Sequence, residues 1–194
     1  MFSQERSFED SLGAQGLGAV PARRLPRPIP PQACVQTAQG PRPAEDLLPG
    51  DLVQTVDHGL QPLRTIRHPA DDPAPMGRPG MVRVAAGALG PGCPARTLAL
   101  SADQRVMLSG WAVECVAGEV EALVTLRDLA GQPGVSMLPL GRSGGPGLGF
   151  DRPEIVMVEG LAILCEVPGT PQLPRMALSG AEAVTAVAMV RTGS

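Results

Sequence analysis

The stretch that decides the fold reads Thr37-Ala38-Gln39-Gly40-Pro41-Arg42-Pro43-Ala44-Glu45-Asp46-Leu47-Leu48-Pro49-Gly50-Asp51-Leu52-Val53-Gln54-Thr55-Val56-Asp57-His58-Gly59-Leu60-Gln61-Pro62-Leu63-Arg64-Thr65-Ile66. Short apolar runs alternate with turn residues, as in Pro49-Gly50-Asp51 and Asp57-His58-Gly59. Gly and Asp favour tight turns, and Pro neither donates to a strand ladder nor continues a helix. The stretch therefore predicts short strands joined by tight turns.

The same pattern continues through most of the chain. Strands are expected at 34–38, 51–57, 62–67, 81–86, 97–100, 104–109, 111–117, 122–126, 135–140, 154–159 and 161–167. Many short strands at close spacing predict an all-β barrel or sandwich. Ser179-Gly180-Ala181-Glu182 has the capping-box pattern and predicts one helix over 181–190. Single helical turns are expected at 43–47 and 125–129.

The distribution of Pro and Gly predicts three parts. Residues 1–33 are expected to form a flexible, Pro- and Arg-rich tail, residues 34–170 a β domain, and residues 171–194 an extension with a short helix. Within the domain, 68–80 is a Pro-rich insertion without periodicity, and 141–149 is expected to be a flexible surface loop.

Composition excludes several classes of function. The 194 residues carry a net charge of −3 and only four aromatic side chains, three Phe and one Trp, so nucleic-acid binding is not expected. No apolar run reaches the length of a membrane span, and the N-terminus lacks the pattern of a signal peptide. The default expectation is a cytoplasmic protein, with secretion by a route that leaves no N-terminal mark still open.

Residue types that are missing restrict the chemistry further. The chain contains no Lys, Asn or Tyr, which excludes any mechanism that needs their side chains. The four cysteines form no C-x-x-C pair, and Cys115 and Cys165 lie in apolar runs typical of buried thiols. His58 is expected to be a turn residue that tolerates an unusual backbone angle. No metal site and no cofactor are predicted.

Several segments, in order, resemble the bacterial Hint-domain family, the fold of hedgehog autoprocessing modules and inteins. After 37–66, the resemblance continues through the segments Val82–Gly90, Leu98–Leu108, Glu121–Leu129 and Phe150–Gly160. It covers roughly residues 28–168 and implies an elongated β-fold with pseudo-two-fold symmetry.

The resemblance also implies which positions would carry the self-cleavage chemistry. An active member begins with a cysteine that attacks the preceding carbonyl, and in register with Gly40 that position is Pro28. The histidine of the Ser-x-x-His-Arg stretch corresponds to Gln104, and a later histidine corresponds to Pro153. Asn, which completes intein splicing, is absent from the chain.

These replacements predict a degenerate Hint domain without autoprocessing activity, acting as a structural or interaction module for an unidentified protein partner. Cys34 is the alternative nucleophile: it would cleave the chain at Ala33-Cys34 by an N–S acyl shift. A third reading is a small-ligand or thiol-modified module built around the cysteines.

Overall fold

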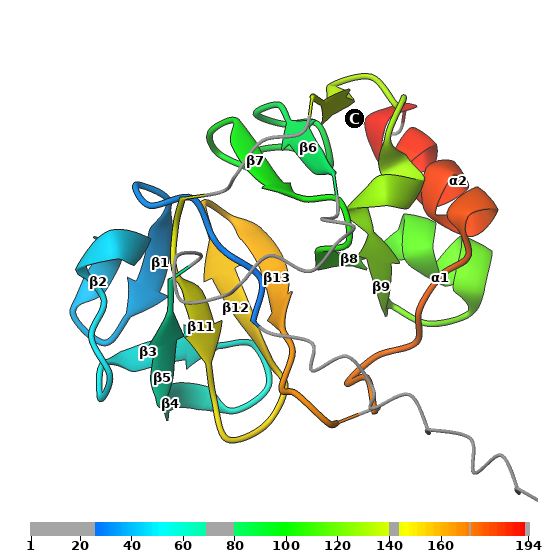
Figure 1. The fold of residues 1–194 in the computed structure, drawn as a ribbon. Coiled ribbons are helices and arrows are strands. Elements are labelled where there is room, and N and C mark those ends of the chain that lie inside the picture. The colour runs from blue at the N-terminus through cyan, green and yellow to red at the C-terminus, as the bar shows by residue number, and fades with distance from the viewer. Residues whose placement is uncertain (1–25, 69–79, 140–143, 171, 193–194) are drawn as a thin grey trace, which may run out of the picture.

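The computed structural model describes residues 26–68, 80–139, 144–170 and 172–192. In these residues many short antiparallel strands are accompanied by two α-helices (Figure 1). The strands are β1 (Cys34–Thr37), β2 (Gly40–Pro43), β3 (Leu52–Thr55), β4 (Gly59–Pro62), β5 (Thr65–Arg67), β6 (Met81–Val84), β7 (Leu98–Ser101), β8 (Arg105–Ser109), β9 (Glu121–Thr125), β10 (Val135–Leu138), β11 (Gly147–Gly149), β12 (Glu154–Val158) and β13 (Leu161–Cys165). The helices are α1 (Trp111–Ala117) and α2 (Gly180–Thr192), with 3₁₀ turns η1 (Ala44–Asp46) and η3 (Leu126–Leu129). The expected mostly β fold with a C-terminal helix is confirmed.

One sheet organises the molecule. Its strand order is β2-β1-β3-β12-β13-β8-β9, and β4 pairs with β3. The hairpin β12–β13 lies in the middle, with Glu154 opposite Cys165 at one end and the Glu159-Gly160 turn at the other. All five residues of β13 are buried, as expected for a central strand covered on both faces.

Two smaller sheets flank this one, β10-β6-β7 and β11-β5. The strand β11 corrects the expectation of a flexible surface loop over 141–149, because Gly147, Leu148 and Gly149 are buried and paired with β5. A Cβ at Gly149 would lie 2.3 Å from the Thr65 hydroxyl. Glycine is thus needed here for close approach of two chains, and not for flexibility. Residues 141–143 lie outside the described residues, as does most of the predicted 68–80 insertion.

The segment 111–117, expected as a strand, is the helix α1. Gly118 ends the helix in the left-handed conformation with φ 74°, and its N–H donates to the Glu114 carbonyl. Glycine at this position is a common helix stop. The buried residues Ala112 and Val113 face the core, while Trp111 is exposed. Gly110 and Gly118 therefore mark the two ends of a helix, and the strand prediction was wrong.

The predicted C-terminal helix is confirmed as α2. Ser179 N–H donates to Glu182 Oε2 at 2.8 Å, and Glu182 N–H donates to Ser179 Oγ at 3.4 Å, which is the reciprocal capping box. α2 packs beside α1 at the end of the sheet remote from β2 (Figure 1). Its buried side chains include Ala183, Ala186 and Val187.

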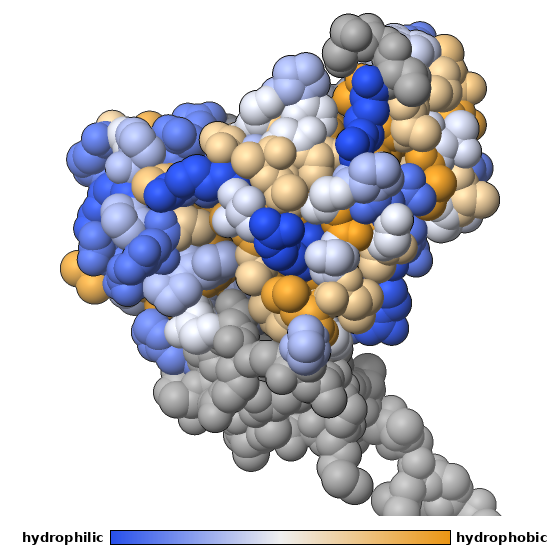
Figure 2. All heavy atoms as spheres, turned by 90° about the horizontal axis from the view of Figure 1, so that it is seen from above, coloured by the Kyte–Doolittle hydropathy of each residue, from blue (hydrophilic) through white to orange (hydrophobic). Residues whose placement is uncertain are grey.

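The surface differs between the two sides of the molecule. Hydrophilic residues dominate the side that carries β1–β4, and hydrophobic residues become more frequent toward the helices (Figure 2). The described helices are all too short or too polar to cross a bilayer.

Candidate functional site

Pro28, the position implied for the nucleophile, is half-buried and lies against the segment that contains Gly147. It forms an antiparallel bridge with Gly147, and the next residue, Ile29, donates its N–H to the Pro146 carbonyl at 2.9 Å and is 1% exposed. A Cβ at Gly147 would meet the Pro26 carbonyl oxygen at 2.4 Å, and one at Gly145 would meet the Ile29 carbonyl oxygen at 1.6 Å. The glycines thus let the proline-rich segment pack backbone to backbone.

The residue before Pro28 is held by two carboxylates. Arg27 Nη1 lies 3.8 Å from Asp103 Oδ2, and its Nη2 lies 3.9 Å from Glu166 Oε2. Asp103 also pairs with Arg127 at 2.5 Å, and Glu166 pairs with Arg105. The Arg27 side chain is only 17% exposed, so these ionic contacts are shielded from solvent better than ordinary surface pairs. They fasten the segment before Pro28 to the start of β8 and the end of β13.

Gln104, the position implied for the first histidine, lies beside this network and is 2% exposed. Its amide Nε2 donates to the carbonyls of Leu164 and Arg105, each at 2.9 Å. These two bonds use both amide hydrogens. Gln104 therefore ties β8 to β13, and an amide cannot transfer a proton near neutral pH.

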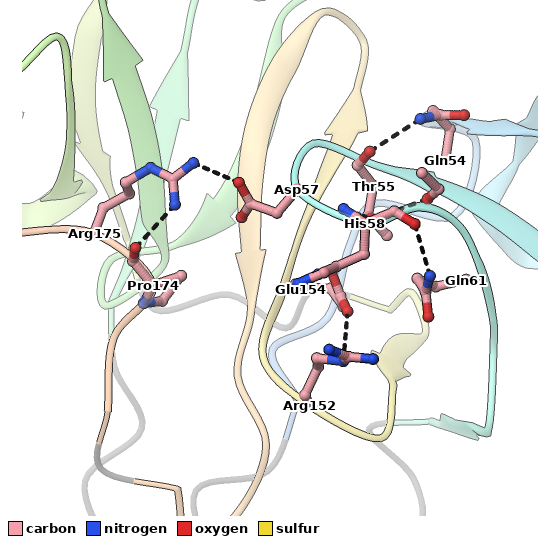
Figure 3. Close-up of polar contacts among 10 residues, drawn as sticks. Gln54, Thr55, Asp57, His58, Gln61, Arg152, Glu154, Pro174 and Arg175 are labelled. Atoms are coloured by element: carbon pink, nitrogen blue, oxygen red, sulfur yellow. Dashed lines mark hydrogen bonds and ion pairs between the residues drawn. The ribbon is translucent and has the colours of Figure 1, made fainter.

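Pro153, the position implied for the second histidine, directly precedes β12. The side chain of the next residue, Glu154, is only 1% exposed. Its Oε2 forms a hydrogen bond with His58 Nδ1 at 2.9 Å. Arg152 Nε lies 3.5 Å from the other carboxylate oxygen of Glu154 (Figure 3). A buried charge needs such partners.

His58 thus binds a carboxylate, which its sequence context did not reveal. The turn assignment is confirmed, but the unusual backbone angle belongs to Gly59, with φ 63°. Among the described residues no group of His, Cys, Asp and Glu has the arrangement of a metal site.

Cys34 lies at the opposite end of the β12–β13 hairpin. Its N–H donates to Glu159 Oε1 at 2.6 Å, and Arg96 Nη2 lies 3.6 Å from its Sγ. Arg96 also binds the Glu159 carboxylate, and this hydrogen bond lowers the pKa of the Glu159 carboxyl. Along strands that rise about 3.3 Å per residue, the Glu159 turn is about 13 Å or more from Glu154.

The other thiols divide by environment. Cys165 is buried, and desolvation raises the pKa of its thiol to about 12, with further contributions from Glu154 and Glu166. Cys115 is exposed, so its expected burial was wrong, whereas that of Cys165 is confirmed. Burial also raises the pKa of the Cys93 thiol.

The structure thus brings the surroundings of Pro28, Gln104 and Pro153 together at one end of β13 and leaves Cys34 at the other. Sequence reasoning missed the charged residues that join them: Arg27, Asp103 and Glu166 are separated by more than 60 residues along the chain. No local pattern marks such a network.

No curated protein shows a significant similarity to this sequence. Among solved structures, the chain matches the crystal structure of gp41-1 intein with a TM-score of 0.38 and 9% identity, over 72% of this chain and 98% of that one. A family comparison matches the Hint domain over residues 30–169, well over half of the chain. The chain therefore belongs to the Hint domain family.

Proposed function

We propose that this protein is a Hint-domain module that does not cleave its own backbone and acts as a structural and interaction unit. The observation that carries the proposal is Pro28, packed against Gly147 at the position where the family resemblance requires a thiol. A proline side chain offers no nucleophile, so the first acyl shift has no attacking group.

The residue at the position implied for the first histidine supports the same conclusion. General acid–base assistance is typically worth about 10²–10⁴ in rate. Gln104 cannot supply it, and both of its amide hydrogens are used in structural bonds to Leu164 and Arg105. The ion pairs of Arg27 with Asp103 and Glu166 hold the segment before Pro28 in place. This favours a chain that keeps this segment over one that cleaves it off.

Cys34 is the competing nucleophile, and one arrangement favours it. The Ala33 carbonyl accepts the Ala44 N–H at 2.9 Å, and the Cys34 N–H is held by Glu159, so the Ala33-Cys34 amide is polarised at both ends. An acyl shift also needs a proton for the departing amine. The described groups around Cys34 are an arginine and a carboxylate paired with it, and no imidazole is among them.

The packing supports module boundaries wider than those expected from composition. Residues 26–33 contribute Ile29 and Ala33 to the core, at 1% and 4% exposure, and α2 contributes Ala183 and Val187. We therefore place the module at residues 26–192, with the proline-rich segment as part of its structure.

The test is the intact mass of the full chain before and after incubation with dithiothreitol at neutral pH. The proposal expects a single species of 20.0 kDa in both samples. A fragment beginning at Pro28 would show cleavage at the family position, and one beginning at Cys34 would show cleavage by the alternative nucleophile. Either would overturn the proposal, and Cys34→Ala would tell the two apart, because it abolishes only the second.

A further inference from the structure

The connection between β8 and β9 forms a small closed lobe. Ser109 pairs with Glu121, and Gly110 N–H donates to the Val120 carbonyl at 2.8 Å, so both ends of the connection meet. α1 lies between them and ends at Gly118. This closure places Val120 beside Gly110, the residue directly before Trp111.

The outer side of the lobe is apolar. Trp111 is 54% exposed and Val120 57% exposed, although both are large hydrophobic residues. Cys115, one helical turn after Trp111, is exposed as well. We call Trp111, Cys115 and Val120 the Trp111 surface. Another side of α1 packs against the rest of the protein, since Ala112 and Val113 are buried.

Carboxylates border this surface. Glu114 lies one turn from Trp111 on the same side of α1, and Glu119 directly precedes Val120; both are exposed. Residues 109–121 contain three Glu and no cationic residue. In the described structure neither Glu114 nor Glu119 forms an ion pair, whereas Glu121 is neutralised by Arg175, which also binds Asp57 (Figure 3).

An indole face next to unpaired carboxylates is complementary to a guanidinium group. Arg stacks on Trp through cation–π attraction and places its planar N–H groups on a neighbouring carboxylate, which the compact ammonium of Lys does less well. An anionic membrane surface would be repelled by the same glutamates. An aromatic side chain buries roughly 150–250 Å² in all. Since Trp111 is 54% exposed, binding would remove about half of that area from water, and Trp is a typical interface anchor.

We infer that the Trp111 surface binds an arginine-bearing apolar segment of a partner protein. This inference rests on the proposed role as an interaction module and names the chemistry of its partner. Its failure would leave the intact-mass result unchanged, so the two claims can fail separately.

The chain carries its own reporter, because it contains one Trp and no Tyr. The full-length protein is titrated with a synthetic peptide of alternating Arg and Leu, and with a matched peptide that has Lys in place of Arg. We expect a saturable change in indole emission with the Arg peptide, binding about tenfold weaker with the Lys peptide, and weakening at high salt. Equal affinity for the two peptides, or no saturable binding, would overturn the inference.

Variants test whether the peptide binds at the Trp111 surface. Fluorescence anisotropy of a labelled Arg peptide measures the binding. Trp111→Ala, and separately the pair Glu114→Gln and Glu119→Gln, should each weaken binding by about tenfold or more. Leu48→Ala is the control, since Leu48 is 64% exposed and lies just before β3, which β12 and β13 separate from β8 and β9 in the sheet. Thermal unfolding checks that each variant is folded. Equal loss in the Leu48 variant would contradict the assignment.

Discussion

The carbonyl oxygen of Ile29 occupies the place where a Cβ on Gly145 would stand, with 1.6 Å between them. Two segments more than 100 residues apart thus meet backbone to backbone next to Pro28, the position that the family resemblance implies for the nucleophile. A segment that fits so closely is held by shape as well as by the ion pairs of Arg27.

This fit predicts that Gly145→Ala is destabilising. The added methyl group meets a backbone atom that cannot rotate away, so the 26–31 segment must shift, at a cost of about 1–3 kcal/mol in the free energy of unfolding. Urea unfolding measures the cost, and faster hydrogen exchange of the Ile29 N–H, which donates to the Pro146 carbonyl, would report the displaced segment. Gly144→Ala is the matched control, because a Cβ there meets nothing within 4 Å. Equal stability of the two variants would contradict the packing described for Ile29.

His58 and Glu154 give a second prediction. The Glu154 side chain is 1% exposed and the His58 ring shares a 2.9 Å hydrogen bond with it, so His58→Ala leaves a buried carboxylate with a poorer set of partners. The expected loss is about 1–3 kcal/mol of unfolding free energy, measured by urea titration. Arg152→Ala should cost less than about 1 kcal/mol, because that guanidinium is 57% exposed and 3.5 Å away.

A double-mutant cycle checks the pairing itself. In a Glu154→Gln background, His58→Ala should cost measurably less than in the parent, since the charge that it leaves unpaired is gone. Additive costs would mean that the histidine stabilises the turn by some other contact.

How much of this could be predicted from the sequence depends on whether the signal is local. The turns of 37–66 and the capping box at Ser179 and Glu182 are local, and both appear where they were expected. The nature of 111–117 is not local: its β-branched and aromatic residues suit a strand, while the packing against α2 and the stop at Gly118 make it a helix.

The site shows the same division. The family resemblance pointed to positions 28, 104 and 153. The sequence alone shows that these positions hold no thiol and no imidazole. The partners that surround them could not be predicted, because Arg27 meets Glu166 only after the hairpin β12–β13 is placed beside β8. Likewise, the sequence around Gly145 and Gly147 is typical of a flexible loop. Only the structure shows that these glycines make room for the backbone of Ile29 and Pro26.

The thiols should differ in reactivity as their environments do. Only a thiolate attacks a maleimide, and it must also be accessible. N-ethylmaleimide at mildly alkaline pH should therefore modify exposed Cys115 rapidly in the native protein and leave buried Cys165 unmodified. Peptide mass spectrometry locates the adducts. A Cys115→Ala variant should lose the fast adduct, and urea should expose all four thiols. Modification of Cys165 before unfolding would show that this end of β13 opens in the native state.

The raised pKa of Cys165 also sets a pH dependence of stability. Burial holds the pKa of this thiol at about 12 in the folded protein, whereas in the unfolded chain it is about 8.5. The unfolded state therefore loses its proton first, so the contribution is complete below about pH 8.5 and is lost progressively as the pH rises toward 12, by up to about 1.4 kcal/mol per pH unit. The chain contains no Lys or Tyr, so few other groups titrate in this range. Cys93, whose pKa burial also raises, is the main other group expected to contribute.

Urea unfolding at about pH 8 and about pH 10 measures this dependence. The free energy of unfolding of the parent should be lower at the higher pH, and this decrease should be smaller in Cys165→Ala, with Cys93→Ala as the parallel variant. An identical drop in the parent and in Cys165→Ala would mean that the thiol at the end of β13 is not kept neutral by burial.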